Sequence, residues 1–264
     1  MTTQRQPSYY IPHGGGPCFF MPDPTGTWIG MAQFLGQLRE ALPETPKAIL
    51  VISGHWETQG FRLTASPNPS LLFDYYGFPA HTYALRYDAP GAPDLAERAA
   101  TRLRTAGLDA TPDTERGLDH GVFVPLMVAL PQADIPVVQM SLDRSLDPAL
   151  HLAAGAALAG LRDEGVLILG SGMSFHNMRG YGDGRFTAPS LAFDEWLTAA
   201  VEAEGPRRNA ALAQWETAPA ARLSHPREEH LIPLMVAAGA SEHAGRKVYG
   251  ELVMNTAVSG FRFD

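Results

Sequence analysis

The chain has 264 residues, of which 45% are hydrophobic and 18% are charged, as in ordinary soluble globular proteins and unlike disordered chains. Lys and Arg total 20 and Asp and Glu total 28, so the net charge of −8 argues against nucleic acid as the main partner, because phosphate binding needs a basic face. No apolar run approaches the length of a membrane span, and residues 1–10 lack the apolar segment of a secretory signal, so we expect no membrane association.

Short apolar runs rich in β-branched residues predict buried strands at 9–11, 48–53, 135–141 and 166–170, and an alternating stretch predicts a strand near a sheet edge at 247–256. Helical patterns lie at 28–41, 94–106, 148–164, 190–204 and 228–239. Strands that alternate with helices indicate βαβ units. We therefore predict an α/β fold in a single domain over residues 1–264, with a central, mainly parallel sheet flanked by helices.

Cysteine usage narrows the chemistry and the compartment. Cys18 is the single cysteine of the chain, which excludes an internal disulfide and a multi-cysteine zinc site. A reducing, cytoplasmic location is the simplest expectation. We expect a buried, inert thiol at this position rather than a soft metal ligand or a nucleophile. No sequence pattern indicates an oligomeric state.

Three of the nine histidines follow predicted strands in the same way. His13 precedes three glycines, His55 follows Gly54, and His176 follows the glycine-rich stretch 170–174. Ligands bind at the carboxyl edge of a parallel sheet, and glycines allow the backbone to approach a ligand closely. A single histidine at a strand end is more often a hydrogen-bonded structural residue than a ligand. Three in one pattern favour a metal or catalytic site at this edge of the sheet.

Two further settings contain histidines that could join such a site. His120 lies in the motif LDHG at 118–121, and His225 and His230 flank the start of a predicted helix. Imidazole is the commonest zinc ligand in proteins and also suits iron and copper. A metal site built from these side chains is therefore the leading hypothesis.

The other motifs and histidines give weaker signals. The glycines at 14–16 lack the spacing of a phosphate-binding loop, so we expect them to bring the backbone close to the metal site. The stretch 170–174 lacks the G-x-S-x-G pattern of a nucleophile elbow. We expect His151 and His243 on the surface of helices or loops, and the role of His81 is open.

Several short motifs occur together and in order: IPHGGGP at 11–17, SGHWE at 53–57, FDYYGFP at 73–79, LDHG at 118–121, GSGMSFHN at 170–177, HP at 225–226 and HLIPL at 230–234. Together they resemble the class III extradiol ring-cleavage dioxygenases of the LigB superfamily, in the branch similar to DOPA 4,5-dioxygenases. The resemblance runs from about residue 9 to the C-terminus, and it is the combination of motifs that is specific.

The resemblance implies a role for each of five histidines. His13 and His55 match two metal ligands, and His230 matches the third ligand position, where many extradiol enzymes have a carboxylate. His176 matches the acid/base catalyst, which can also lie close enough to ligate zinc. His120 matches a pocket histidine that helps to bind substrate or oxygen.

The implied chemistry is cleavage of a catechol by Fe(II) and O2 beside the two hydroxyl groups, which gives a product of the muconic semialdehyde type. Three facial protein ligands leave positions open on Fe(II) for both reactants. His176 would accept a catechol proton, since imidazole titrates near neutral pH, and His120 would hydrogen-bond oxygen. Phe123 departs from relatives that often have Trp there, a change that reshapes the pocket.

Zinc is the second metal to expect. Four neutral imidazoles, those of His13, His55, His176 and His230, suit a tetrahedral zinc ion, which would then occupy the acid/base residue. We therefore expect that the isolated protein can contain zinc although Fe(II) is the catalytic metal.

The substrate is less evident from the sequence. Aromatic residues near the motifs are candidates either for a flat ring-binding pocket or for ordinary core packing: Phe19, Trp56, Tyr75, Tyr76, Phe78 and Phe175. The carboxylate of a DOPA-like substrate needs a cationic partner, and Arg179, Arg185 and Arg227 are the candidates.

Two alternatives to the dioxygenase stay open. The first is a zinc-dependent hydrolase of an amide or ester, in which Glu57 or Glu229 is the general base. The second is a non-catalytic relative that keeps the fold. The metal that supports turnover and the consumption of O2 discriminate among the three.

Overall fold

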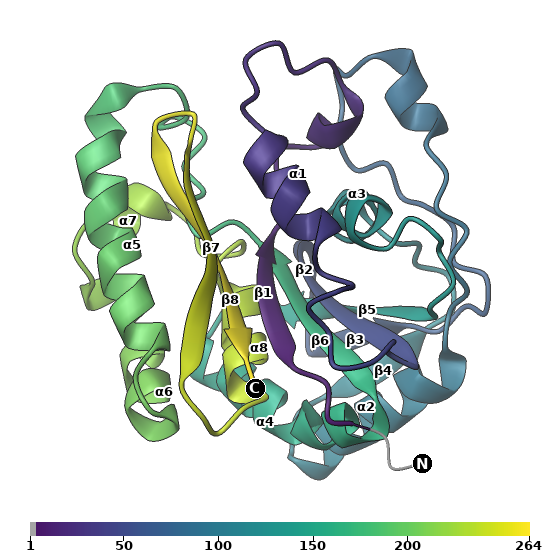
Figure 1. Cartoon of the computed structure of the whole chain (residues 1–264). Helices are drawn as coiled ribbons and strands as arrows, with labels where there is room; N and C mark the ends of the chain where they lie inside the picture. Colours follow the sequence, from purple (N-terminus) through teal and green to yellow (C-terminus); the bar gives the residue numbers. More distant parts are fainter. Residues whose placement is uncertain (1–3) are drawn as a thin grey trace.

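A computed structural model describes residues 4–264. The first three residues of the segment 1–10, which is not expected to be a secretory signal, lie outside the described part. Within this described part, eight strands form one sheet in the order β4-β3-β5-β2-β6-β1-β8-β7 (Figure 1). Their bounds are Ser8–Pro12 (β1), Ala48–Thr58 (β2), Phe61–Thr64 (β3), Ala110–Asp113 (β4), Val137–Asp143 (β5), Val166–Gly172 (β6), Gly245–Val253 (β7) and Thr256–Phe263 (β8).

The four central strands β5, β2, β6 and β1 run parallel, as the apolar runs predict. Antiparallel pairs extend the sheet on both sides, through β3 beside β5 and through β8 beside β1. The α/β fold class and the mainly parallel centre are therefore confirmed.

Helices cover both faces of the sheet (Figure 1). Their bounds are Ile29–Gly36 (α1), Pro93–Thr105 (α2), His120–Ala129 (α3), Pro148–Leu158 (α4), Thr187–Val201 (α5), Gly205–Ala213 (α6), Ala221–Ser224 (α7) and Ile232–Gly239 (α8). Short 3-10 turns lie at Cys18–Phe20, Ala80–Ala84, Ala159–Glu164, Gly184–Phe186 and Trp215–Thr217.

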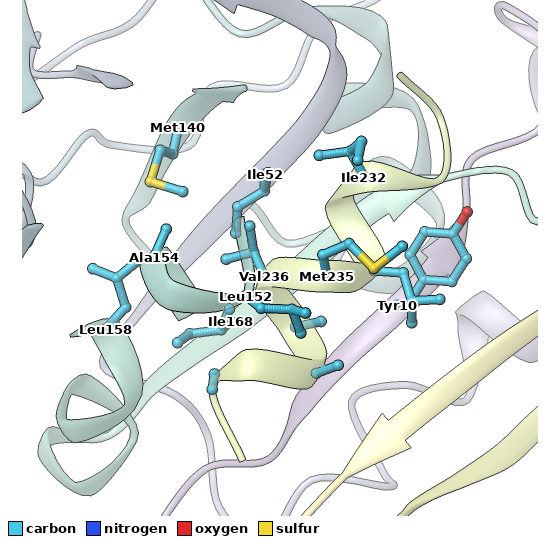
Figure 2. Close-up of a cluster of buried hydrophobic side chains, with 14 of the residues drawn as sticks. Tyr10, Ile52, Met140, Leu152, Ala154, Leu158, Ile168, Ile232, Met235 and Val236 are labelled. Carbon is cyan, nitrogen blue, oxygen red and sulfur yellow. The ribbon is translucent and has the colours of Figure 1, made fainter. Parts of the chain in front are cut away.

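Side-chain alternation along the strands builds a separate core on each face. Leu50 and Ile52 of β2 enter the core that includes α2, α4 and α8, whereas Ile49 and Val51 enter the core that includes α1 and α3. Figure 2 shows the first core, where Ile52 and Ile168 of neighbouring strands lie close to side chains of α4 and α8. Each fully buried aliphatic side chain contributes about 1.5–3 kcal/mol, so the strand carboxyl ends are held rigidly.

The C-terminal strand prediction needs a correction. The stretch 247–256 is not one strand, because the chain turns at Met254 and Asn255, which both have positive φ, and returns as β8. Two residues with positive φ are typical of a type I′ hairpin turn, whose twist matches that of the strands it joins. The edge position of β7 is confirmed.

Other predicted boundaries also shift. The strand that begins at Ala48 continues to Thr58, so His55 lies within an irregular part of β2 and not beyond its end. The helix predicted at 228–239 begins at Ile232. Six elements that the patterns did not predict, β3, β4, β8, α3, α6 and α7, also belong to the fold.

The surface position predicted for His151 is wrong. Its ring is fully buried beside Phe61. Nδ1 donates to the Asp147 carbonyl at 2.7 Å, and Nε2 accepts from the Asp143 amide at 3.1 Å. His151 therefore joins β5 to the start of α4, a structural role. His243 is exposed, as predicted.

Candidate metal centre

The fold gathers five histidines from distant parts of the chain at one edge of the parallel strands. His13 follows β1, His55 lies near the end of β2, His120 begins α3, His176 follows β6 and His230 precedes α8. Ring centroids are 5.0 Å apart for His13 and His55, 5.1 Å for His13 and His230, and 4.6 Å for His55 and His230. The sequence prediction named all five side chains.

Glycines allow the backbone turns that aim the first two rings. Gly14 and Gly16, directly after His13, have φ of 78° and 52°, which side-chain-bearing residues rarely adopt. On β2 the pairing with β5 shifts register between Ile52 and Glu57. A bulge of this kind re-aims side chains, and here it contains His55.

His230 is fixed through its own backbone. Its carbonyl accepts hydrogen bonds from the Tyr10 hydroxyl at 2.7 Å and from the Met173 amide at 3.2 Å. A Cβ built on Gly172 would overlap the same carbonyl. The end of β6 therefore packs directly against the segment that presents the His230 ring.

Three imidazole side chains converge at one point. His13 Nδ1 donates to the Gly14 carbonyl at 2.8 Å, which leaves its buried Nε2 without a hydrogen-bond partner among residues 4–264. His230 Nδ1 donates to Glu229 Oε1 at 2.9 Å, and its Nε2 lies 3.1 Å from Nε2 of His55. One ligand atom of each of His13, His55 and His230 lies within 4.8 Å of the others.

The charge state of the three rings suits the binding of a cation. Burial and the neighbouring imidazoles hold the pKa of His13 and of His230 well below the ordinary value, and they lower that of His55 to about 3. All three rings are therefore neutral near pH 7, so each has a nitrogen lone pair that can bind a cation. A divalent ion at this point satisfies them, and Nδ1 bonded to a carbonyl or carboxylate is the usual support of a metal-binding histidine.

Asp74 supports His120 and contacts His55. Asp74 Oδ1 accepts from the backbone amide of His120 at 3.0 Å and from its Nδ1 at 2.7 Å, while Oδ2 lies 3.7 Å from His55 Nδ1. Burial alone would raise the pKa of Asp74, but the hydrogen bonds from His120 outweigh it and the net shift is downward. Asp74 is therefore ionised at neutral pH. Sequence reasoning gave it no role, although it stands in the motif 73–79.

A buried polar network fixes His55 relative to α3. Ser53 Oγ donates to Asp119 Oδ1 at 2.8 Å and accepts from the His55 amide at 3.2 Å. Asp119 also accepts from Gln139 and lies 3.3 Å from Arg116. In the sequence, the motifs 53–57 and 118–121 drew attention only through their histidines. In the fold, the hydrogen bond between Ser53 and Asp119 joins the two motifs directly.

Glu229 connects His176 to the three converging histidines. Its Oε1 lies 3.0 Å from His176 Nδ1, and the His176 ring stacks on His230 with centroids 3.5 Å apart. Arg227 forms a bidentate ion pair with Glu57 at 2.5 and 2.6 Å and lies 3.5 Å from Glu229. Burial raises the pKa of Glu229, but the hydrogen bond from His176 and other contacts lower it on balance.

A cavity of about 300 Å³ opens beside His176, the one histidine of the five on its wall. It is lined by Gly14, Gly15, Trp28, Met173, His176, Met178, Tyr181 and Met254. Trp28 and Tyr181 are thus the aromatic residues of the wall, and neither was predicted. Trp28 carries no local signal because it is brought in by the packing of α1.

The aromatic residues proposed from sequence lie elsewhere. Trp56 is buried against the Arg116 guanidinium, 5.0 Å from its ring centroid, and Phe175 is buried in contact with Tyr181 and Phe186. The remaining four also fall outside the cavity wall; Tyr75 packs against His120, and Tyr76 is 91% exposed.

The remaining candidates take no part in this geometry. Cys18 is buried, which raises the pKa of its thiol to about 12 and fits the inert role predicted. His225 is buried behind the site, where its Nε2 donates to the Ser174 carbonyl at 2.8 Å. His81 is exposed and donates to the Phe20 carbonyl at 3.0 Å. Arg185 pairs with Asp183 on the surface.

Across residues 4–264, none of the helices combines the length and apolar character that a bilayer crossing requires. The family described as the catalytic LigB subunit of aromatic ring-opening dioxygenase matches residues 8–262.

Curated relatives are similar over most of their length. A protein named 4,5-DOPA dioxygenase extradiol from Beta vulgaris is 44% identical over 85% of this chain and 83% of its own. One of the same name from Escherichia coli is 37% identical over 91% of this chain and 87% of its own. A protein of Hapsidospora irregularis named Dioxygenase tasH is 39% identical over 92% of this chain and 80% of its own.

Among solved structures, an uncharacterized protein from Escherichia coli K12 superposes with a TM-score of 0.78. The two sequences are 29% identical, and the superposition covers 98% of this chain and 100% of the other.

Proposed function

The chain belongs to the LigB family of aromatic ring-opening dioxygenases, and we propose that it uses Fe(II) and O2 to cleave a catechol beside its two hydroxyl groups. The observation that supports this most strongly is the convergence of the imidazole rings of His13, His55 and His230, two of which already have a hydrogen bond at Nδ1 that leaves Nε2 for a metal ion. We propose residues 1–264 as one catalytic domain. The product is of the muconic semialdehyde type.

His13, His55 and His230 would hold the metal ion, which supplies a Lewis acid and redox centre where catechol and O2 meet. Many extradiol enzymes place a carboxylate in the third ligand position, whereas His230 is neutral. Glu229 accepts from His230 Nδ1 and Asp74 lies beside His55, so two carboxylates stand next to the ligands and balance the charge of a divalent cation.

His176 is the proposed acid/base catalyst. Its Nδ1 is held by Glu229, so Nε2 is the nitrogen left to accept a catechol proton. The carboxylate also stabilises the imidazolium formed when that proton arrives. His176 is on the cavity wall, and its ligand atom lies near those of Glu229 and His230 and not in the group formed by His13, His55 and His230. We therefore propose that His176 transfers the proton and does not bind the metal.

His120 is proposed to orient the reactants. Asp74 accepts from its Nδ1, which fixes the ring and leaves Nε2 to face the oxygen atoms at the site. The ring centroid of His120 lies 4.0 Å from that of His55, close enough for its Nε2 to hydrogen-bond a ligand next to the metal position.

Zinc would compete for His13, His55 and His230, and we propose that it occupies them in protein isolated without added iron. The hydrolase alternative receives no support from the geometry. Glu57 is bound to Arg227 through both oxygens, and Glu229 is engaged by two histidines, so neither carboxylate is a free base.

The test is the iron content and O2 consumption of ligand variants loaded with Fe(II) without air. His13→Ala, His55→Ala and His230→Ala should each lose bound iron and O2 uptake with catechols. His243→Ala removes an exposed histidine and should keep both. Wild-type iron content in His55→Ala would overturn the ligand assignment.

A further inference from the structure

The cavity beside His176 has an unusual wall for a site that would receive an amino acid. It is built from the loop after β1, the segment after β6 and the β7–β8 hairpin turn, whose parent elements are labelled in Figure 1. Within the described residues 4–264, its lining contains no Lys, Arg, Asp or Glu. Three methionines, Met173, Met178 and Met254, and Trp28 are four of its eight lining residues.

The two polar side chains on the wall, those of Tyr181 and His176, are each held by a neighbour through one atom. The Tyr181 hydroxyl donates to the Phe175 carbonyl at 2.7 Å, and burial raises its pKa, so it stays protonated and offers no charge. His176 Nδ1 is held by Glu229. A charged substituent inside this cavity would lose water without finding an opposite charge.

The nearby arginines do not alter this conclusion. Arg227 is neutralised by Glu57 and Glu229, and Arg185 by Asp183. Arg179 follows Met178 but is exposed and is not on the wall. Of these three arginines, it is therefore the one that an amino-acid substrate would have to recruit from outside the cavity.

We infer that the preferred substrate is a catechol whose ring substituent is uncharged and apolar, and not an amino acid such as DOPA. The inference rests on the proposed function and narrows its substrate class. Methionine side chains and a tryptophan ring contact alkyl groups favourably, and each methylene that leaves water strengthens binding about fourfold. A carboxylate or ammonium group gains nothing comparable here.

The test compares four catechols with chains of similar length: 4-propylcatechol, dihydrocaffeate, dopamine and DOPA. With Fe(II)-loaded protein, kcat/KM for 4-propylcatechol should exceed that of each charged analogue by at least about tenfold, the gain from burying two or three methylenes. An equal or higher kcat/KM for DOPA or dihydrocaffeate would overturn the inference.

A binding measurement separates failure of the inference from failure of the proposed function. Quenching of Trp28 fluorescence without air reports occupancy of the cavity, and Trp28→Phe should remove the signal. If O2 is not consumed with any of the four, ring cleavage fails, but the order of their Kd values still decides the inference. Tightest binding of 4-propylcatechol supports it, and tighter binding of DOPA overturns it.

Variants localise the preference to the wall. Met178→Arg should improve kcat/KM for dihydrocaffeate relative to 4-propylcatechol by at least about tenfold, because it adds the missing cation. Leu191→Arg is the matched control, since Leu191 is exposed on α5 away from the cavity, and it should leave the ratio unchanged. Arg179→Ala should also leave the ratio unchanged; a selective loss of DOPA turnover would show that Arg179 binds the carboxylate and would overturn the inference.

Discussion

At the scale of single residues, the hydrogen bond on one nitrogen of each imidazole decides what the other nitrogen can do. The Gly14 carbonyl orients His13, Glu229 orients both His230 and His176, and Asp74 orients His120. Each partner accepts a hydrogen bond from Nδ1 and leaves Nε2 for the site. The two carboxylates therefore orient one proposed ligand, His230, the proposed acid/base catalyst, His176, and His120.

Glu229→Gln tests this support. The amide keeps the size of the side chain but removes the charge and cannot accept equally well from two rings, so Fe(II) affinity and kcat should each fall about 10- to 100-fold. Iron affinity is measured by chelator competition and kcat by O2 uptake.

Glu228→Gln is the matched control for this change. Glu228 pairs with Arg222 and contacts none of the five histidines in the described residues, so both quantities should be unchanged. Equal losses in the two variants would mean that Glu229 has no specific role.

The buried His225 ring should lower the stability of the fold in acid. Its pKa is about 3 in the fold, because burial disfavours the charged ring, against 6.5 ordinarily. The unfolded chain therefore binds a proton that the folded chain does not, so stability is full above pH 6.5 and falls as the pH drops toward 3. Between pH 7 and 5 this group should cost about 2 kcal/mol.

The measurement is urea unfolding of metal-free protein at both pH values. His225→Gln can keep the hydrogen bond to the Ser174 carbonyl but does not titrate, so it should lose about 2 kcal/mol less than wild type over this interval. His243→Gln should behave as wild type. An equal pH dependence in wild type and His225→Gln would show that the buried ring does not drive the acid instability.

At the scale of elements, close backbone contact between β6 and the start of α8 sets the position of His230. A Cβ on Gly170 would overlap the Pro233 carbonyl, and one on Gly172 would overlap that of His230. No rotamer change relieves an overlap with backbone, so either the strand or the His230 segment must move.

Gly172→Ala should therefore weaken the metal site more than the fold. We expect Fe(II) affinity to fall at least about tenfold, since displacement of His230 disturbs one of three ligands. Gly36→Ala is the control: a Cβ there meets nothing within 4 Å, and stability should be unchanged or rise by about 0.5–1 kcal/mol. Thermal unfolding and iron titration measure both effects, and wild-type iron affinity in Gly172→Ala would contradict the proposed packing role.

Elements with strong local signals were predictable from the sequence, and those set by tertiary contacts were not. The apolar runs of β2 and β6 and the glycine-histidine pattern after them predicted the edge where the site forms. The helix α3 was not predicted because it is apolar and buried on nearly all sides and contains Pro125, so its sequence has no 3.6-residue alternation of apolar and polar residues. The hairpin turn at Met254 and Asn255 lacks glycine. Trp28 and Asp74 reach the site only through packing of distant segments.

At the scale of the whole molecule, the proposed ligands span residues 13 to 230 and meet only when β1, β2, β6 and α8 are in place. An unfolded chain cannot present this site, so metal binding stabilises the folded state alone. Folding and metal loading are therefore linked across the entire sheet.

Metal addition should raise the unfolding temperature. At a free metal concentration of 100 times Kd the gain is about 2.7 kcal/mol, which is about 5–10 °C for a domain of this size. Metal-free protein is scanned with and without Fe(II) in the absence of air. His55→Ala should show no shift and His243→Ala the full shift; a full shift in His55→Ala would place the metal elsewhere.

The most direct test of the central claim is mass spectrometry of the product formed from 4-propylcatechol under ¹⁸O2 by Fe(II)-loaded protein, with the aldehyde reduced at once to prevent exchange with water. The account predicts a ring-opened product that contains both atoms of O2, and no such product from His55→Ala. A product without the label, or an intact ring in protein shown to hold iron, would contradict it.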